Sequence, residues 1–223
     1  LNTLTYPDNS TLRYIYGEYD GTTNFAGIND LSGQIDELGN RVDTTTYTAY
    51  YATVRTTVGA AGANPTTVTN DPHDSTRYSV TDSLGATTTT EVSYMFGVSK
   101  PMTVTRTCPG CTTQTTAYTY DPNGRIATRV DGNNNLTVTT YDSQGLLLSK
   151  VEAQGMPSQR TTETTWDLTL RVPLIQTVKD ATGTLKSKQG WAYNATGQTT
   201  AQCLIDPVAA PSYTCAPTGT APA

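Results

Sequence analysis

Hydrophobic and polar residues alternate along several short runs in the middle of the chain. The runs cover residues 115–120, 125–130, 135–141 and 146–152. In the second run, Ile126, Thr128 and Val130 alternate with more polar or smaller neighbours. A period of two residues indicates a β-strand with one face directed toward a core. The pattern therefore predicts four consecutive strands, each with one buried face.

A turn signature separates these runs and recurs elsewhere. In an Asp-x-x-Gly sequence the carboxylate accepts hydrogen bonds from nearby backbone amides, and Gly adopts the left-handed conformation that closes a type I turn with a bulge. The signature occurs at 30–33, 36–39, 82–85, 121–124, 142–145 and 180–183, with an Asn-led variant at 194–197. The run "DGNNN" from Asp131 is of the same kind, because Asn tolerates a positive φ. Each signature predicts a hairpin turn.

Helical periodicity is not sustained anywhere along the sequence. The run "AGINDLSGQIDELGN" (26–40) is interrupted by Gly27, Gly33 and Gly39, so we interpret it as strand, turn and strand. The stretches 58–67 and 207–223 have the composition of loops. The sequence predicts an all-β protein.

A short phrase repeats within the central runs. Tyr120-Asp121 and Tyr141-Asp142 stand 21 residues apart, each at the end of a predicted strand. A repeat of this length is typical of an array of like units, here with one hairpin per unit. A lone two-stranded hairpin is marginal in water, so the units must pair side by side.

Composition narrows the class of protein. Of 223 residues, 47 are Thr and only 15% are charged, which favours strands with a hydroxyl-rich surface. The net charge of -5 argues against a nucleic-acid partner, which would require a basic face. No apolar run approaches the roughly 18 residues that a membrane-spanning helix needs. We expect no nucleic acid and no membrane span.

Four cysteines, at Cys108, Cys111, Cys203 and Cys215, form an even set. Together with the low charge, this indicates an oxidising, extracellular or cell-surface location. Proximity favours the pairs Cys108–Cys111 and Cys203–Cys215. A redox pair at Cys108–Cys111, other pairings and a shared zinc ion remain alternatives. The Cys203–Cys215 bridge would fix an otherwise mobile tail.

"YTYDPNGRI" (118–126), followed by an Asp-led turn and a second Tyr-Asp with Gly three positions on, resembles the Rhs or YD-repeat family. "LTYPDNSTLRYIY" (4–16), "DELGNR" (36–41), "YSVTDSLGATTT" (78–89) and "WAYNATGQTTAQC" (191–203) are similar to more degenerate units. The resemblance implies a continuous antiparallel sheet that spirals into a hollow shell. In bacteria such shells often enclose a C-terminal toxin, and in animals they form part of large cell-surface proteins.

The same resemblance implies structural roles for the repeated residues. Tyr120 and Tyr141 would be packing rings, and Asp121 and Asp142 would close turns. Gly124 and Gly145 would be left-handed corners, and Arg125 would be a stacking or pairing group.

Candidate catalytic and metal-binding groups are few. His73, the only His, has Asp71 and Asp74 nearby, the elements of a base and its orienting acid, although a solvated turn His is the simpler interpretation. Asp131, Asn133, Asn135 and Asp142 have the spacing of calcium-loop ligands, but Leu136 occupies the place of the required Gly and a turn is the simpler interpretation.

Two pairs of acids would suit a carbohydrate-active solenoid, namely Asp36 with Glu37 and Glu18 with Asp20. Neighbours on a strand point to opposite faces, which weighs against this use. We expect no catalytic, cofactor-binding or metal-binding residue and no enzymatic activity.

The sequence as a whole predicts a repeat region over 1–206 and a Pro-, Ala- and Thr-rich tail over 207–223. The expected function is structural, as part of an Rhs/YD shell wall around toxin cargo. Its partners would be further repeats of a longer chain or other copies of itself, with toxin cargo or surface glycans as further candidates. An extracellular fibre polymerised through open sheet edges is the alternative, and a carbohydrate-active solenoid is a weaker one.

Overall fold

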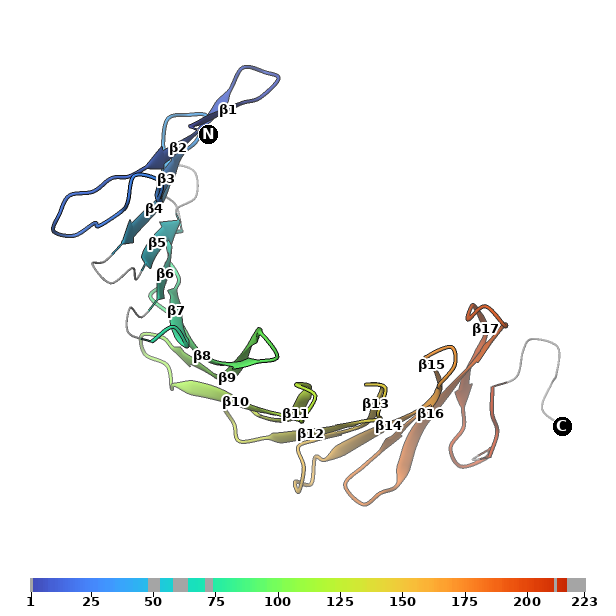
Figure 1. Cartoon of the computed structure of the whole chain (residues 1–223). Coiled ribbons are helices and arrows are strands. Elements are labelled where there is room, and N and C mark those ends of the chain that lie inside the picture. The colour runs from blue at the N-terminus through green and yellow to red at the C-terminus, as the bar shows by residue number, and fades with distance from the viewer. Residues whose placement is uncertain (1, 48–52, 58–63, 71–73, 211, 216–223) are drawn as a thin grey trace. The chain divides into compact units, whose positions relative to one another are not determined.

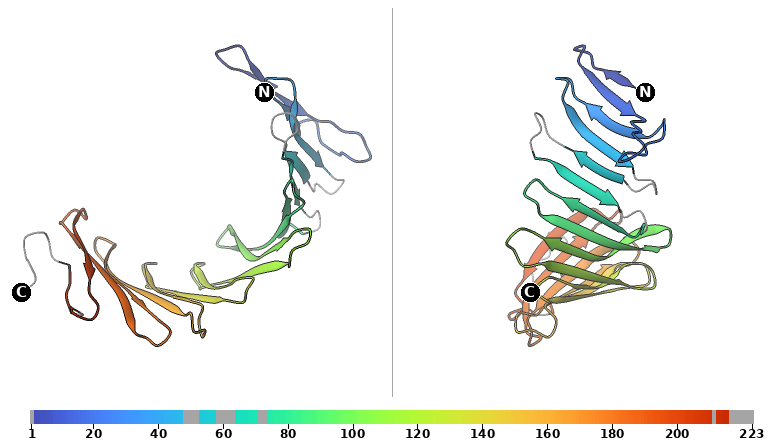
Figure 2. Two further views of the ribbon diagram at one scale, coloured as in Figure 1. Left: turned by 180° about the vertical axis from the view of Figure 1, so that it is seen from behind. Right: turned by 90° about the vertical axis from the view of Figure 1, so that its left-hand side faces the viewer.

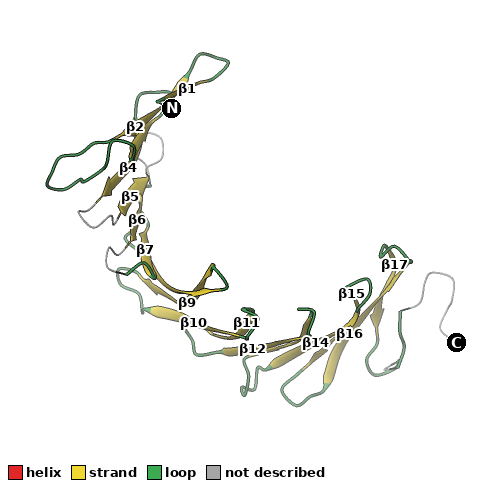
Figure 3. Ribbon diagram, viewed as in Figure 1, coloured by secondary structure: helices red, strands yellow, loops and turns green. Residues whose placement is uncertain are grey.

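A computed structural model describes residues 2–47, 53–57, 64–70, 74–210 and 212–215. Among these residues, seventeen strands form one open antiparallel sheet and no helix is present. Figure 3 shows only strands and loops in the described chain. The all-β prediction is confirmed. Within the described part, no helix is long and apolar enough to cross a membrane.

The chain divides into two compact units, Leu1–Ala117 and Tyr118–Ala223. The first unit contains β1 (Thr3–Thr5), β2 (Thr11–Tyr16), β3 (Leu31–Ile35), β4 (Arg41–Tyr47), β5 (Thr53–Thr57), β6 (Thr66–Asn70), β7 (Arg77–Thr81), β8 (Thr87–Met95) and β9 (Val98–Thr107). The boundary between the units falls within β10 (Gln114–Tyr120). The second unit continues with β11 (Ile126–Val130), β12 (Leu136–Tyr141), β13 (Leu147–Glu152), β14 (Arg160–Asp167), β15 (Val172–Lys179), β16 (Leu185–Tyr193) and β17 (Thr199–Ile205). These elements are labelled in Figure 1.

Each unit is a meander in which a strand pairs with the next one along the chain. In the second unit, Thr128 lies opposite Val138, Val138 opposite Val151, and Val151 opposite Thr161. In the left view of Figure 2, the strands of the second unit follow one another in chain order from yellow through orange to red. Because each pairing is local, the turn signatures were sufficient to place the central strands within one residue of the predicted runs.

Threonine contributes to the sheet through its hydroxyl as well as its β-branch. The hydroxyl oxygens of Thr56 and Thr67 lie 3.1 Å apart, and those of Thr81 and Thr87 lie 2.9 Å apart. Both pairs join neighbouring strands. Such cross-strand hydroxyl pairs stabilise a sheet, and both of these lie at half-buried positions. The Thr-rich composition is therefore consistent with a sheet that buries little.

The fully buried residues are few and mostly small or polar. The buried apolar side chains among the described residues are Ala26, Ala86, Leu146, Ala192 and Ile205. The prediction that every strand has one buried face is wrong for β11, where Ile126 is 38% exposed. In β16, by contrast, alternate residues are buried from Lys188 to Ala192. Ala86 and Leu146 directly follow hairpin turns, whereas Ala26 and the buried residues of β16 lie where a connecting segment folds back over the sheet. The described strands form a single layer.

The run 26–40 differs from its prediction. Residues 27–30 form a turn in which the Asp30 amide donates to the Gly27 carbonyl at 2.8 Å, and residues 31–35 are β3. Gly33 is therefore a strand residue and not the end of an Asp30–Gly33 turn. The turn at 36–39 is present, and Gly39 has a φ of 83°.

Candidate functional site at the linked turns

The turn at Asp121–Gly124 is defined by four hydrogen bonds. The Asp121 amide donates to the Arg125 carbonyl at 2.8 Å, and the Gly124 amide donates to the Asp121 carbonyl at 2.9 Å. The Asp121 carboxylate accepts from the amides of Asn123 and Arg125 at 2.9 and 2.8 Å. Gly124 has a φ of 75°. This is a type I turn followed by a left-handed bulge residue, which reverses the chain between antiparallel strands.

The same set of bonds recurs along the chain. In each case the side-chain oxygen of the first residue accepts amides two and four positions on, and the fourth residue has a positive φ. The further instances begin at Asp36, Asp82, Asp131, Asp142, Asp180 and Asn194. At the Asp131 turn the fourth position is Asn134, with a φ of 62°. A single local module thus forms many of the hairpin ends.

Hydrogen bonds favour the charged form of three of these carboxylates, those of Asp36, Asp131 and Asp180. Hydrogen bonds from the side chain and amide of Asn135 lower the pKa of Asp131. The amide of Asn40 is the main cause of the lowered pKa of Asp36, and the Thr182 hydroxyl is the main cause at Asp180. Donors directed at a carboxylate stabilise the anion relative to the neutral acid. These groups are therefore acceptors at neutral pH and poor proton donors.

Arg125 joins one turn to the next copy of the Tyr-Asp phrase. Its guanidinium carbon lies 5.4 Å from the centroid of the Tyr141 ring. Its Nη1 donates to the Asp142 carbonyl at 3.0 Å and lies 3.9 Å from the Asp121 carboxylate. A Cβ built on Gly145 would lie 3.3 Å from the Arg125 guanidinium. Arg125 therefore bridges two units, and Gly145 leaves room for it.

A second arginine reaches the same turn from the other side. Arg171 Nη2 donates to the Gln144 carbonyl at 3.1 Å. The turn that carries Arg171 is closed by the Asp167 carboxylate, which accepts the amide of Leu170 at 2.9 Å. Strands alternate in direction, so the turns after β10, β12 and β14 lie along one side of the sheet. We call residues 121–125, 142–145 and 167–171 the linked turns.

Two disulfides are present. Cys108 is bonded to Cys111, and Cys203 is bonded to Cys215. The first closes the connection between β9 and β10. Its Pro109 lies beside the neighbouring turn, because a Cβ on Gly85 would be 3.5 Å from the proline ring. The local pairing makes Cys108–Cys111 a clip between two strands.

The second disulfide holds the tail over β16 and β17. A Cβ built on Gly190 would lie 3.0 Å from the Cβ of Cys215, so the tail approaches the strand closely. Lys188 Nζ donates to the Tyr213 carbonyl at 2.8 Å, and Lys188 is only 7% exposed. Residues 213–215 of the tail therefore lie against the most clearly alternating strand of the second unit.

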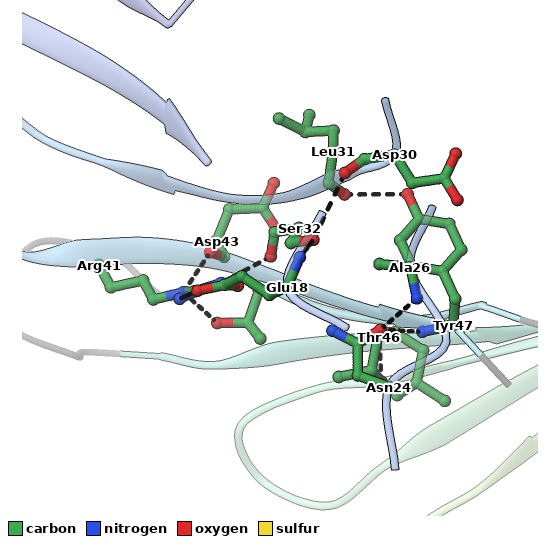
Figure 4. Close-up of polar contacts among 12 residues, drawn as sticks. Glu18, Asn24, Ala26, Asp30, Leu31, Ser32, Arg41, Asp43, Thr46 and Tyr47 are labelled. Atoms are coloured by element: carbon green, nitrogen blue, oxygen red, sulfur yellow. Dashed lines mark hydrogen bonds and ion pairs between the residues drawn. The ribbon is translucent and has the colours of Figure 1, made fainter. Parts of the chain in front are cut away.

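A folded-back segment in the first unit was not anticipated. Residues 17–30 connect β2 to β3 and lie over the start of β3 and the end of β4 (Figure 4). Asn24 Oδ1 accepts the amides of Ala26 and Tyr47, both at 3.1 Å, and the Phe25 amide donates to the Tyr47 carbonyl at 2.7 Å. The Tyr47 hydroxyl donates to the Leu31 carbonyl at 2.9 Å. Most of these bonds join residues that are distant in sequence, so a local sequence pattern does not predict them.

The same segment is held at its other end by an ion pair. Arg41 donates to both carboxylate oxygens of Glu18, at 2.9 and 2.5 Å, and to the Ser32 carbonyl at 2.7 Å. Arg41 lowers the pKa of Glu18. A Cβ on Gly33 would be 2.4 Å from Arg41 Nη2 and 2.6 Å from the Asp43 carbonyl, so only Gly fits there. The role of Gly33 is to admit the guanidinium.

The structure places the candidate chemical groups apart or engages them in turns. Glu18 binds Arg41, while Asp20 accepts the amides of Thr22, Thr23 and Asn24. These bonds lower the pKa of Asp20, with the Thr23 hydroxyl as the main cause. His73 and Asp71 lie outside the described residues. Within the described chain, no group of three or more His, Cys, Asp or Glu side chains is arranged to hold a metal ion.

Comparison with known proteins gives matches among solved structures only. No protein-family model and no curated protein matches the chain. A chain of the Photorhabdus luminescens Tc holotoxin pore is 11% identical, with a TM-score of 0.29 over 87% of this chain and 14% of that one. A chain of the TcdB2-TccC3 crystal structure is 11% identical, with a TM-score of 0.27 over 91% of this chain and 15% of that one. The chain thus spans about one seventh of the length of these proteins.

Proposed function

We propose that this chain is a non-enzymatic, repetitive section of an extracellular or cell-surface sheet wall of the Rhs/YD type. The linked turns carry this proposal. Arg125 contacts the Tyr141 ring and the Asp142 carbonyl, so it joins one unit to two residues that define the repeat in the next unit. Arg171 adds a contact with the Gln144 carbonyl of the same turn. A residue set used in this way specifies how one hairpin follows the next.

The ionisation of the turn acids supports a structural role. A glycosidase needs one carboxyl group with a raised pKa that donates a proton. Here hydrogen bonds lower the pKa of Asp36, Glu18 and Asp20, three of the four carboxylates considered for such a reaction. Their oxygens are occupied by amides, hydroxyls or Arg41, and they hold the backbone in place.

The open sheet supports association with more sheet. The end strands of an open sheet present unpaired amides and carbonyls, which are templates for another strand. We propose that further repeats of a longer chain continue the sheet, and that the resulting wall surrounds a toxin cargo. The two disulfides suit an oxidising, extracellular setting.

Negative-stain microscopy of the native protein, in its full-length form, tests this role. The proposal expects closed, hollow particles. Filaments would favour the alternative, a fibre subunit that polymerises through the same open edges. Particles that are neither closed nor filamentous would contradict both.

An activity assay tests the non-enzymatic part separately. The Asp36→Asn variant keeps a side-chain acceptor in the turn, as Asn194 does in its own turn. We expect no release of sugars from glycans by the native protein. Release that is lost in Asp36→Asn, with the melting temperature unchanged, would establish the carbohydrate-active alternative and overturn the proposal.

A further inference from the structure

The two disulfides differ in what surrounds them. Cys111 and its neighbours from 109 to 115 are all exposed. Cys203 and Cys215 are half-buried, and the tail that carries Cys215 lies against β16. Thiol–disulfide exchange requires that an attacking thiolate reach one of the two bonded sulfurs. Access therefore favours attack on the bond between Cys108 and Cys111.

The turn that holds this disulfide is closed by the backbone as well. The Cys111 amide donates to the Cys108 carbonyl at 3.2 Å, and Gly110 has a φ of 76°. Pro followed by Gly with a positive φ is typical of a type II turn, which brings its first and fourth residues close together. The Cα atoms of Cys108 and Cys111 are 5.4 Å apart. The turn therefore keeps both sulfurs within reach of each other when the bond between them is broken.

The strand ladders on either side of the turn are also formed by other bonds. Thr107, at the end of β9, lies opposite Thr87, and Gln114, at the start of β10, lies opposite Arg106. Residues 108–113 lie between these strands and belong to neither. A disulfide across so short a loop constrains the unfolded chain less than one across a longer loop. Reduction would thus open the connection and leave both ladders in place.

We propose that Cys108–Cys111 is a thiol–disulfide exchange site, at which a low-molecular-weight thiol attacks Cys111 and Cys108 re-forms the bond. The exposed Cys111 is the attacked residue, and the half-buried Cys108 is the resolving one. Two residues between the cysteines is the spacing of known redox pairs. Exposed disulfides are the labile and regulatory ones, whereas covered ones are structural. The site does not depend on the sheet being part of a shell wall.

The exchange proceeds in two displacements. A thiolate attacks Cys111 Sγ and forms a mixed disulfide there, while the bond to Cys108 breaks and its electron pair leaves on Cys108 Sγ, which takes a proton from water. A second thiolate attacks the external sulfur of the mixed disulfide, and Cys111 leaves as a thiolate and is protonated in turn. The protein disulfide is thereby reduced to two thiols, and two external thiols are oxidised to one disulfide. In the reverse direction, the Cys108 thiolate attacks Cys111 Sγ and expels the external thiol.

Timed reduction of the native protein by glutathione tests the proposal. Free thiols are blocked with N-ethylmaleimide at intervals, and the protein is digested with trypsin. Cleavage after Arg106 and Lys188 leaves each pair of cysteines on its own peptide, so mass spectrometry gives the reduced fraction of each pair. We expect Cys108–Cys111 to be reduced about tenfold faster or more, because its sulfur is accessible. The Cys203–Cys215 bond is the control within the same molecule.

Two single variants test the separate roles of the cysteines. Cys108→Ser leaves Cys111 as a free thiol, and Cys111→Ser leaves Cys108 free. With glutathione disulfide as the probe, Cys108→Ser should form the mixed disulfide several times faster, because its remaining thiol is the exposed one. Hydrogen exchange of the reduced wild type should increase within residues 108–113 and stay unchanged in β8 and β9.

Reduction of the two disulfides at similar rates, or of Cys203–Cys215 first, would overturn the proposal. Faster formation of the mixed disulfide in Cys111→Ser would contradict the assignment of Cys111 as the attacked residue. Increased hydrogen exchange throughout β8 and β9 after reduction would show that the bond is structural, and would likewise overturn the proposal.

Discussion

The Arg125 guanidinium lies over the Tyr141 ring, 5.4 Å from its centroid, and joins two repeats that are separate in sequence. The same side chain donates to the Asp142 carbonyl at 3.0 Å. One residue thus satisfies a backbone acceptor and stacks on an aromatic ring in the next unit. The spacing of the two Tyr-Asp phrases sets this contact.

Replacing Arg125 should weaken the junction between the two units. Arg125→Ala removes both contacts, and we expect a loss of about 1–2 kcal/mol in the free energy of unfolding, measured by urea denaturation. Arg129→Ala is the matched control, because Arg129 is an exposed arginine on the neighbouring strand β11. An equal loss in the two variants would show that the Arg125 contacts contribute nothing specific.

The left-handed corner of a turn can be tested without a steric clash. Gly183 has a φ of 81°, and a Cβ built there meets nothing within 4 Å. Gly183→Ala should therefore lower the free energy of unfolding by about 1–2 kcal/mol through backbone strain alone. Gly183→Asn should cost less, since Asn adopts this conformation more readily. Thermal denaturation of the wild type and the two variants gives their order of stability. Equal stability of the Ala and Asn variants would contradict the assignment of strain to the positive φ.

Gly33 tests a different requirement, which is space rather than conformation. Gly33→Ala would force a methyl group against Arg41 and the Asp43 backbone, and we expect a loss of about 2–3 kcal/mol from overpacking. Gly27→Ala in the same unit is the control. There the new Cβ would lie 3.1 Å from the end of the Asp30 side chain, which can move. Similar chemical denaturation curves for both variants would show that the Arg41 contact is dispensable.

Reduction of the second disulfide should release the tail. In the chain-entropy account, a bridge across a loop of this size contributes about 3 kcal/mol. Cys203→Ser with Cys215→Ser should expose residues 206–215 to limited proteolysis, monitored by mass spectrometry. The double variant Cys108→Ser with Cys111→Ser should leave cleavage of the tail unchanged. A tail that stays resistant after loss of the Cys203–Cys215 bond would mean that the Lys188–Tyr213 contact alone holds it.

Acid should destabilise the turns. The pKa values of Asp36, Asp131 and Asp180 are lower in the folded chain than the ordinary value of 3.8. Their contribution to stability is present above that value and is lost as the pH falls through the lower folded pKa values, because the unfolded chain takes up protons first. Replacing all three with Asn should flatten the decrease in melting temperature below about pH 4. An unchanged acid profile would show that other carboxylates dominate it.

The strands and turns that depend on residues close together in sequence could be predicted. The strands between residues 115 and 152 match their runs because Asp121, Asp131 and Asp142 each close a turn within four residues. The exposure of Ile126 was not predictable from alternation, because alternation shows that the two faces of a strand differ and not that a second layer covers one of them. The described strands form a single layer, so a regular pattern can leave an isoleucine in water.

The folded-back segment 17–30 could not be predicted for a related reason. Its position depends on pairs such as Asn24 with Tyr47 and Glu18 with Arg41, each 23 residues apart. Spacing alone does not tell a turn glycine from one that makes room for a side chain, which is why Gly33 was misassigned.

The repeated turn fixes the chain through its first and fourth residues and leaves the two between them unconstrained. In five of these turns the two positions hold Glu-Leu, Ser-Leu, Pro-Asn, Ser-Gln and Ala-Thr, while the first residue accepts the amide two positions on in every case. The central residues of the hairpin turns can therefore change by point mutation while the strands and the turn hydrogen bonds stay the same.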